Sequence, residues 1–199
     1  MTLYRTIVAD PPWPFRWDGR AGGKRRNATT IGYPTMTVDD ICAADIASFA
    51  HPDGAHLFMW ATDEMYREGQ AVRVARAWGF EPVSCLIWRK PNFGTGHFPR
   101  HGHEPLLYAR RGSLPAIGER GVHSVQTWAQ PREKGNGGKV HSRKPDGALD
   151  LIERVASGPF LEVFARRARF NWDYAGDGSH GTVTIPGLRA PGEPSERAA

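Results

Sequence analysis

The tetrapeptide Asp10-Pro11-Pro12-Trp13 follows an apolar run at Thr6–Ala9 that predicts a buried strand. The proline pair ends this strand, because proline has no N–H group to continue a ladder. A carboxylate and a backbone carbonyl at such a bend suit the exocyclic amino group of adenine. Both would accept its hydrogen bonds and stabilise the positive charge that develops as the nitrogen attacks. The tryptophan is then placed to stack on an everted base; the alternative is a tight turn that ends in a core tryptophan.

Apolar runs that alternate with amphipathic stretches supply the elements that must position this motif. Strands are predicted at residues 6–9, 56–61, 83–88, 104–109, 160–165 and 171–175, and helices at 38–50, 65–78 and 146–156. Nearly apolar strands separated by helices are typical of a parallel sheet covered on both faces. We therefore predict an α/β, Rossmann-like fold with three layers and a mostly parallel sheet. Ligands gather at the carboxyl ends of such strands, where Asp10 is expected.

Length and composition predict one globular domain at residues 1–181. The chain has 199 residues, of which 40% are hydrophobic and 24% charged, a balance that excludes wholesale disorder. A stretch rich in proline and small polar residues predicts a disordered tail at 182–199. No apolar run approaches the ~18 residues that cross a bilayer, so no membrane partner is expected.

Cysteine and histidine spacing gives no metal or disulfide signal. Cys42 and Cys85 are far apart and show no C-x-x-C pattern, so we expect neither a disulfide scaffold nor a zinc ribbon, and a cytoplasmic location. His101 and His103 flank one glycine, but no third ligand stands at a plausible spacing. No metal site is predicted.

The formal net charge is +5, and positive charge is concentrated in two basic, glycine-rich stretches. Residues 16–27 and 131–145 each carry five cations against one carboxylate. Solvated surface loops are one interpretation; loops that contact nucleic-acid phosphates are the other, and two such loops in one small domain favour it. The first loop directly follows the tetrapeptide, so Lys24, Arg25 and Arg26 are candidate contacts to a substrate strand.

Several motifs in one order resemble the adenine-6-amino methyltransferases, the family of the eukaryotic messenger-RNA adenosine methylase and its bacterial and phage relatives. The resemblance covers residues 5–178. It rests on ADPPW at 9–13, YPTM at 33–36, LFMWAT at 57–62, AWGF at 77–80, LIWRK at 86–90, HE at 103–104, HSRKPD at 141–146, EVFAR at 162–166 and NW at 171–172. It implies a methyltransferase three-layer sandwich with a permuted motif order, in which the catalytic strand precedes the cofactor strand.

The resemblance also implies roles for individual residues. The catalytic motif would be Asp10, Pro11, Pro12 and Trp13. Contacts to S-adenosylmethionine would come from Asp10, Lys144, Phe164, Arg166, Arg169 and Asp177, with Lys144 at the cofactor carboxylate and Phe164 and Arg166 near its ribose and adenine. Substrate contacts would come from Trp13, Tyr33, His103, Glu104, His141 and Ser142. Ala168 and Gly178 depart from the family pattern, so Arg169 and Asp177 are expected to substitute for the missing polar groups.

The implied function is site-specific methylation of the 6-amino group of adenine by S-adenosylmethionine. We expect a bacterial or phage enzyme acting on DNA; the alternatives are adenosine methylation in RNA and a catalytically silent nucleic-acid-binding subunit. The intact tetrapeptide favours an active enzyme, and the missing Gly-x-Gly-x-x-Gly loop argues against a dehydrogenase. A chain of this length leaves little room for a target-recognition domain, so the alternatives are a short target sequence, relaxed specificity, or recognition supplied by a homo-oligomer or a partner subunit.

Overall fold

The computed structural model describes residues 2–14, 34–92, 98–114, 118–131, 143–176 and 181–188. A seven-stranded sheet forms its centre, in the order β5-β3-β4-β2-β1-β6-β7. The strands are β1 (Thr6–Ala9), β2 (Gly54–Trp60), β3 (Glu81–Arg89), β4 (His103–Gly112), β5 (Val125–Gln126), β6 (Phe160–Val163) and β7 (Trp172–Ala175). The helices are α2 (Val38–Ala43), α3 (Asp63–Arg67), α4 (Gln70–Ala77) and α5 (Asp146–Val155), with a 3₁₀ turn at Ala47–Phe49. None of these helices is long and apolar enough to cross a membrane.

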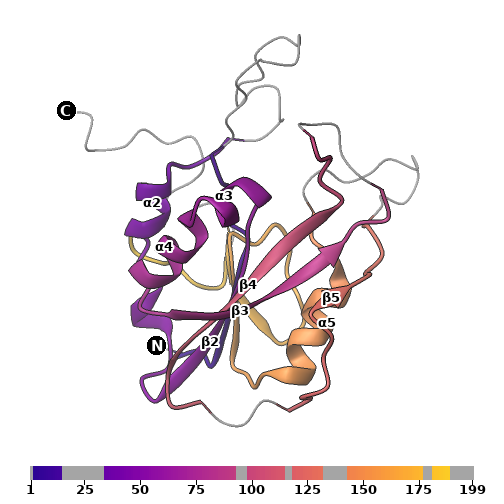
Figure 1. Ribbon diagram of the computed structural model, residues 1–199. Coiled ribbons are helices and arrows are strands. Elements are labelled where there is room, and N and C mark those ends of the chain that lie inside the picture. The colour runs from indigo at the N-terminus through magenta and orange to yellow at the C-terminus, as the bar shows by residue number, and fades with distance from the viewer. Residues whose placement is uncertain are drawn as a thin grey trace, which may run out of the picture.

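The sheet is covered on both faces, with α2, α3 and α4 on one side and α5 on the other (Figure 1). Strand β2 is apolar except at His56, and its side chains pack against both helical layers. Leu57 and Met59 pack into the core beside α2 and α4, whereas Phe58 and Trp60 pack into the core beside α5. Successive side chains of a strand point to opposite faces, so a strand between two helical layers needs apolar residues at every position.

Strand direction brings distant parts of the chain to one edge of the sheet. The central strand β1 runs parallel to both β2 and β6, with Ala9 opposite Met59 and Val163. Among the seven strands, every pairing is parallel except those of β4, which runs antiparallel to β2 and β3. This confirms the predicted Rossmann-like α/β fold with a mostly parallel sheet. The start of β4 consequently lies at the edge where β1, β2, β3 and β6 end.

Two predicted helices are shorter than their apolar patterns. The helix predicted at 38–50 ends at Ala43, because the N–H of Asp45 donates to the carbonyl of Pro186 instead of continuing the helix. The helix predicted at 65–78 is divided into α3 and α4 at Gly69, which has a φ of 74°. Glycine adopts this left-handed conformation without steric cost, so it can end one helix and begin the next.

The prediction of a disordered tail from residue 182 is wrong for residues 182–188. The N–H of Thr182 donates to the carbonyl of Tyr174, and the Ile185 side chain is 3% exposed in the core beside α2. Ile185 is buried, Val183 and Leu188 pack against the same core, and the Asp45 N–H donates to the Pro186 carbonyl, so these contacts hold the segment in place. Residues 189–199 lie outside the described part of the chain.

Candidate active site

Asp10 lies at the carboxyl edge of the sheet, directly after β1, and its backbone N–H extends the ladder by donating to the carbonyl of Val163. Its side chain is only 18% exposed. Burial raises the pKa of Asp10, a change that the nearby Lys144 ammonium opposes. A carboxylate of raised pKa is a stronger hydrogen-bond acceptor than an exposed aspartate, and it lies where the sequence predicted a catalytic group.

The two prolines form a tight turn whose carbonyls are partly used by the protein itself. The N–H of Trp13 donates to the Pro11 carbonyl at 2.8 Å, and the N–H of Met36 donates to the Pro12 carbonyl at 2.9 Å. A carbonyl oxygen has two lone pairs, so each can accept one further hydrogen bond. These backbone bonds fix the direction of the carbonyls beside Asp10.

Alternating charges connect Asp10 to three other side chains. Lys144 Nζ lies 2.9 Å from Asp10 Oδ1 and 2.8 Å from Glu104 Oε1, while Lys90 Nζ lies 2.8 Å from Glu104 Oε2. Burial alone would raise the pKa of Glu104, but the two lysines bring it below its usual value. Burial opposes the charge on Lys144, yet its two carboxylate partners raise its pKa. Glu104 reaches this network because β4 runs against its neighbours and begins at their carboxyl edge.

Asp10 and Lys144 face a cavity of about 260 Å³ that contains four of the predicted site residues. Its lining consists of Asp10, Trp60, Arg143, Lys144, Pro145, Leu149, Glu162, Phe164, Arg166 and Arg167. Phe164 follows β6, is 7% exposed and has a φ of 62°, an uncommon conformation outside glycine. The turn after β6 therefore brings Phe164 and Arg166 to the same cavity as the residues after β1.

Glu162 is a cavity residue that the sequence analysis missed. Burial, followed by the charge of Asp10, raises its pKa to about 7, and its Oε2 atom has no hydrogen-bond partner in the described part of the chain. Arg143 Nε, at the same cavity, is likewise buried without a partner there. Buried polar atoms are nearly always hydrogen-bonded in proteins. This acceptor and this donor therefore suit a polar ligand in the cavity.

Trp13 is not among the residues that line this cavity. Its side chain is 6% exposed, and its Nε1–H donates to the carbonyl of Trp60 at 2.8 Å. The indole is therefore part of the core beside α2, which corrects the expectation that it stacks on the target base. The tryptophan anchors the turn that carries Asp10.

Arg169 is also not at the cavity. Its guanidinium lies 2.7 Å from Asp150 and 2.8 Å from Glu153, both on α5, and stacks near the Trp172 ring. These carboxylates raise the pKa of Arg169. Arg169 links the segment before β7 to α5, which corrects the expectation that it contacts the cofactor.

Of the remaining predicted residues, His103 is not part of the cavity lining, and the others lie outside the described residues. His103 Nε2 lies 3.5 Å from Asp63 Oδ1 beside Glu104, so its substrate contact stays a prediction. Within the described ranges, no three His, Cys, Asp or Glu side chains are grouped as a metal site would require. The predicted residues outside these ranges are Lys24, Arg25, Arg26, Tyr33, His141, Ser142 and Asp177.

The family model MT-A70 matches residues 4–178, a range that contains all seven strands and the whole cavity lining. The chain belongs to the MT-A70 family. This confirms the resemblance to the adenine-6-amino methyltransferases that the motifs indicated.

Relatives in this family have names that specify adenosine methylation. The chain is 28% identical over 176 residues to the N(6)-adenosine-methyltransferase MT-A70-like protein of Drosophila melanogaster, covering 82% of this chain and 24% of that protein. It is 28% identical over 195 residues to the human N(6)-adenosine-methyltransferase catalytic subunit METTL3 (89% and 29%). It is 32% identical over 190 residues to the N6-methyladenosine RNA methyltransferase MTA1 of Cryphonectria parasitica (88% and 51%). The matched region thus spans from about a quarter to about half of each relative's length.

Proposed function

We propose that this MT-A70 protein transfers a methyl group from S-adenosylmethionine to the 6-amino group of adenine in RNA. The observation that carries the proposal is the placement of Asp10. A buried carboxylate with a raised pKa stands at the carboxyl edge of the sheet, paired with Lys144 and facing a cavity with unpartnered polar atoms.

RNA replaces DNA as the proposed substrate. The DNA expectation finds no support among the relatives, because the names of the fungal relatives specify RNA and those of the animal relatives specify adenosine. The basic stretches at 16–27 and 131–145 suit either polyanion, since phosphate contacts carry no information about the sugar.

The cavity suits the chemical groups of S-adenosylmethionine, the methyl donor of METTL3-type enzymes. Glu162 offers a carboxylate acceptor for hydroxyl or amino groups, and Arg143 offers a donor for a carboxylate. Phe164 and Leu149 provide apolar walls for an adenine ring. When bound, the donor supplies an electrophilic methyl group on its sulfonium.

Asp10 and the Pro11 carbonyl would hold the target amino group by accepting its two N–H bonds. This arrangement exposes the nitrogen lone pair and stabilises the positive charge that develops on it. Lys144 opposes the protonation of Asp10 that burial favours, and so helps this carboxylate to accept hydrogen bonds. Asp10 need not remove a proton before attack, because the nitrogen becomes more acidic as it is alkylated.

Target selection in this proposal involves a second component. METTL3 is named as a catalytic subunit, and the present chain covers 29% of it. A partner subunit, or a second copy of this chain, would contact RNA outside the adenine that enters the site.

A methyl-transfer assay tests the proposal directly. The protein is incubated with radiolabelled S-adenosylmethionine and single- or double-stranded RNA and DNA of one sequence, followed by nucleoside analysis. We expect label in N6-methyladenosine from adenine-containing RNA and none from the same RNA with adenine replaced. Label in DNA alone, or in another nucleoside, would contradict the proposal; Asp10→Ala serves as the control for background transfer.

A further inference from the structure

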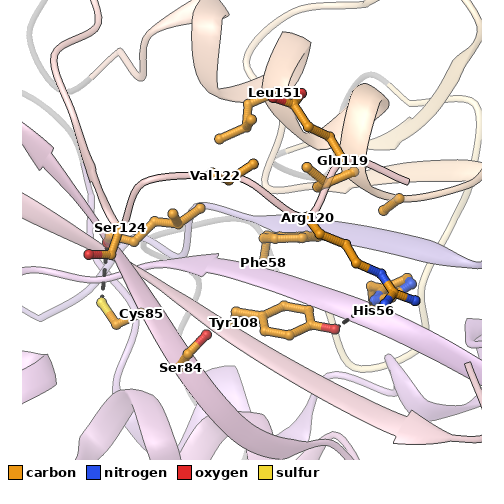
Figure 2. Close-up of a pocket in the computed structure, with 13 residues that line it drawn as sticks. His56, Phe58, Ser84, Cys85, Tyr108, Glu119, Arg120, Val122, Ser124 and Leu151 are labelled. Atoms are coloured by element: carbon orange, nitrogen blue, oxygen red, sulfur yellow. Dashed lines mark hydrogen bonds between the residues drawn. The ribbon is translucent and has the colours of Figure 1, made fainter. Parts of the chain in front are cut away.

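A second cavity of about 490 Å³ lies on the α5 face of the sheet, within the range of ~300–1,000 Å³ typical of ligand sites. Strands β2, β4 and β3 form its floor, and α5 with residues 119–124 forms its walls (Figure 2). His56, in this floor, pairs with Thr6 at the start of β1, whereas Asp10 follows the end of that strand. The cavity is therefore separate from the candidate active site.

The floor carries three aromatic rings side by side. The Phe58 and Tyr108 rings have centroids 5.1 Å apart, and the His56 and Tyr108 rings lie 5.8 Å apart with an angle of 27° between their planes. Val122 and Leu151 line the cavity from the segment and the helix that cover this floor (Figure 2). A flat aromatic floor under an aliphatic wall matches the shape and surface of a planar ring.

Neutral polar groups lie within this floor. His56 Nδ1 is 2.9 Å from the Tyr108 hydroxyl (Figure 2). Burial lowers the pKa of His56 and raises the pKa of Tyr108, so both are uncharged near neutral pH. Ser84 adds a hydroxyl from β3. These groups can hydrogen-bond to the polar edge of a heterocycle and do not favour a charged ring.

Positive charge lies beside the cavity. Arg120 lines it, and Arg110 stands directly opposite His56 in the β2–β4 register, which puts both side chains on one face of the sheet. Neither arginine has an ion-pair partner among the described residues. Glu119 does not offset them, because its carboxylate already binds Arg154 at 2.9 Å. The cavity thus joins an aromatic floor to two uncompensated guanidinium groups.

We propose that this cavity binds a nucleoside monophosphate unit, with the base on the aromatic floor and the phosphate at Arg110 and Arg120. Arginine binds phosphate through paired N–H donors, and bases stack on aromatic side chains. The unit is either a free nucleotide or one nucleotide of an RNA strand. Because the site lies apart from Asp10, the proposal does not depend on the methyl-transfer reaction.

Calorimetric titration with adenosine 5′-monophosphate, adenosine and ribose 5-phosphate tests the site. We expect the intact nucleotide to bind more tightly than either part. Changing Arg110 and Arg120 together to Ala should weaken the affinity for the nucleotide by about tenfold, the usual scale for charged hydrogen bonds to phosphate. The affinity for adenosine should not change. Arg76→Ala, an exposed arginine on α4 across the sheet, should change neither affinity and serves as the matched control.

Ser84→Phe places a ring on the floor of the cavity at an exposed position, so the protein should fold normally. The ring should block the cavity and abolish the affinity for both the nucleotide and adenosine. Unchanged nucleotide affinity in this variant would overturn the proposal. So would a dimer in sedimentation that Ser84→Phe dissociates, since a second copy would then fill the cavity. A short oligoadenylate that binds more tightly than the mononucleotide, with the same dependence on both arginines, would assign the unit to RNA; equal or weaker binding would assign it to a free nucleotide.

Discussion

The carboxylates of Asp10 and Glu104 share one ammonium group, that of Lys144, at 2.9 and 2.8 Å. All three side chains are less than one-fifth exposed. Two buried carboxylates this close would repel each other without the lysine between them. Lys144 therefore stabilises the negative charge of Asp10, the catalytic candidate, and also fixes the position of Glu104.

Replacing Asp10 by Ala should reduce methyl transfer by about 10²–10³-fold, the usual cost of losing one preorganised electrostatic partner. Binding of S-adenosylmethionine should change little, because Lys144 keeps Glu104 as a partner. Asp10→Asn retains one oxygen acceptor and should be more active than the alanine variant. Single-turnover rates and calorimetric affinities measure the two effects, and near-normal turnover in Asp10→Ala would refute the mechanism.

Lys144→Met should lower the free energy of unfolding by about 3–5 kcal/mol at pH 8, because it removes the ammonium group beside the buried Asp10 and leaves Glu104 with Lys90 alone. The pKa of Asp10, which burial already raises, would then rise further. Raised folded-state values favour the folded state at low pH and lose that effect as pH rises, so the penalty should shrink toward pH 4. Lys90→Met is the matched control: its loss should cost less, since Glu104 keeps Lys144. Denaturant unfolding at several pH values compares the variants.

Glu162→Gln should stabilise the protein at pH 8 and remove part of its pH dependence. The folded-state pKa of about 7 exceeds the reference value of 4.5, so the folded protein retains a proton that the unfolded chain loses. The contribution of Glu162 to the free energy of unfolding is therefore fully present below pH 4.5. It falls as the pH rises from 4.5 to about 7, by roughly 3 kcal/mol in total. The difference in unfolding free energy between wild type and variant should thus grow across this range. A constant difference would contradict the assignment.

Trp13 variants should affect stability more than base recognition. Trp13→Ala removes a buried indole and should cost about 3–5 kcal/mol. Trp13→Phe keeps most of the packing but leaves the Trp60 carbonyl unpaired, at a cost of about 1–3 kcal/mol. The KM of the phenylalanine variant for RNA should match that of wild type at a temperature where both are folded. A raised KM for RNA would instead indicate that Trp13 contacts the target base.

Replacing Lys24, Arg25 and Arg26 together by Ala should flatten the salt dependence of RNA affinity. Each phosphate contact on a single strand contributes about −0.7 to the slope of log affinity against log salt, so the loss should approach two units. Changing Arg67, Arg73 and Arg76 to Ala removes the same charge from α3 and α4, where each arginine pairs with a carboxylate. The slope of this control should equal that of wild type. Equal slopes for both triple variants would favour the solvated-loop interpretation.

The strands and the position of Asp10 could be predicted because they depend on local patterns. An apolar run that stops at a proline pair specifies both a buried strand and its end. The antiparallel direction of β4 has no such local signal, so the Lys90–Glu104–Lys144 network could not be derived from periodicity. Only the spacing of motifs in the family resemblance indicated Glu104 and Lys144.

Trp13 and Arg169 were predicted at the wrong place because their positions depend on contacts with distant parts of the chain. Trp13 is buried because the Trp60 carbonyl, far along the chain, accepts its hydrogen bond, and no feature near Trp13 encodes that contact. Arg169 has its carboxylate partners on α5, which the spacing of the cofactor motif does not reveal. Glu162 did carry a signal. An acidic residue between Leu161 and Val163 in an apolar strand must either face a site or be neutralised.

The position of β1 between β2 and β6 determines when this site can form during translation. Asp10 is synthesised before its lysine partner, Lys144, and before β6, one of the two neighbours of its strand. Until β6 emerges, β1 has an open edge, and the Asp10 carboxylate remains solvated. A nascent or truncated chain that stops before residue 144 therefore contains the complete tetrapeptide and still lacks the ion pair. The ion pair and the β1–β6 pairing can form only after residues 144 and 160–163 have been made, because both contacts are non-local.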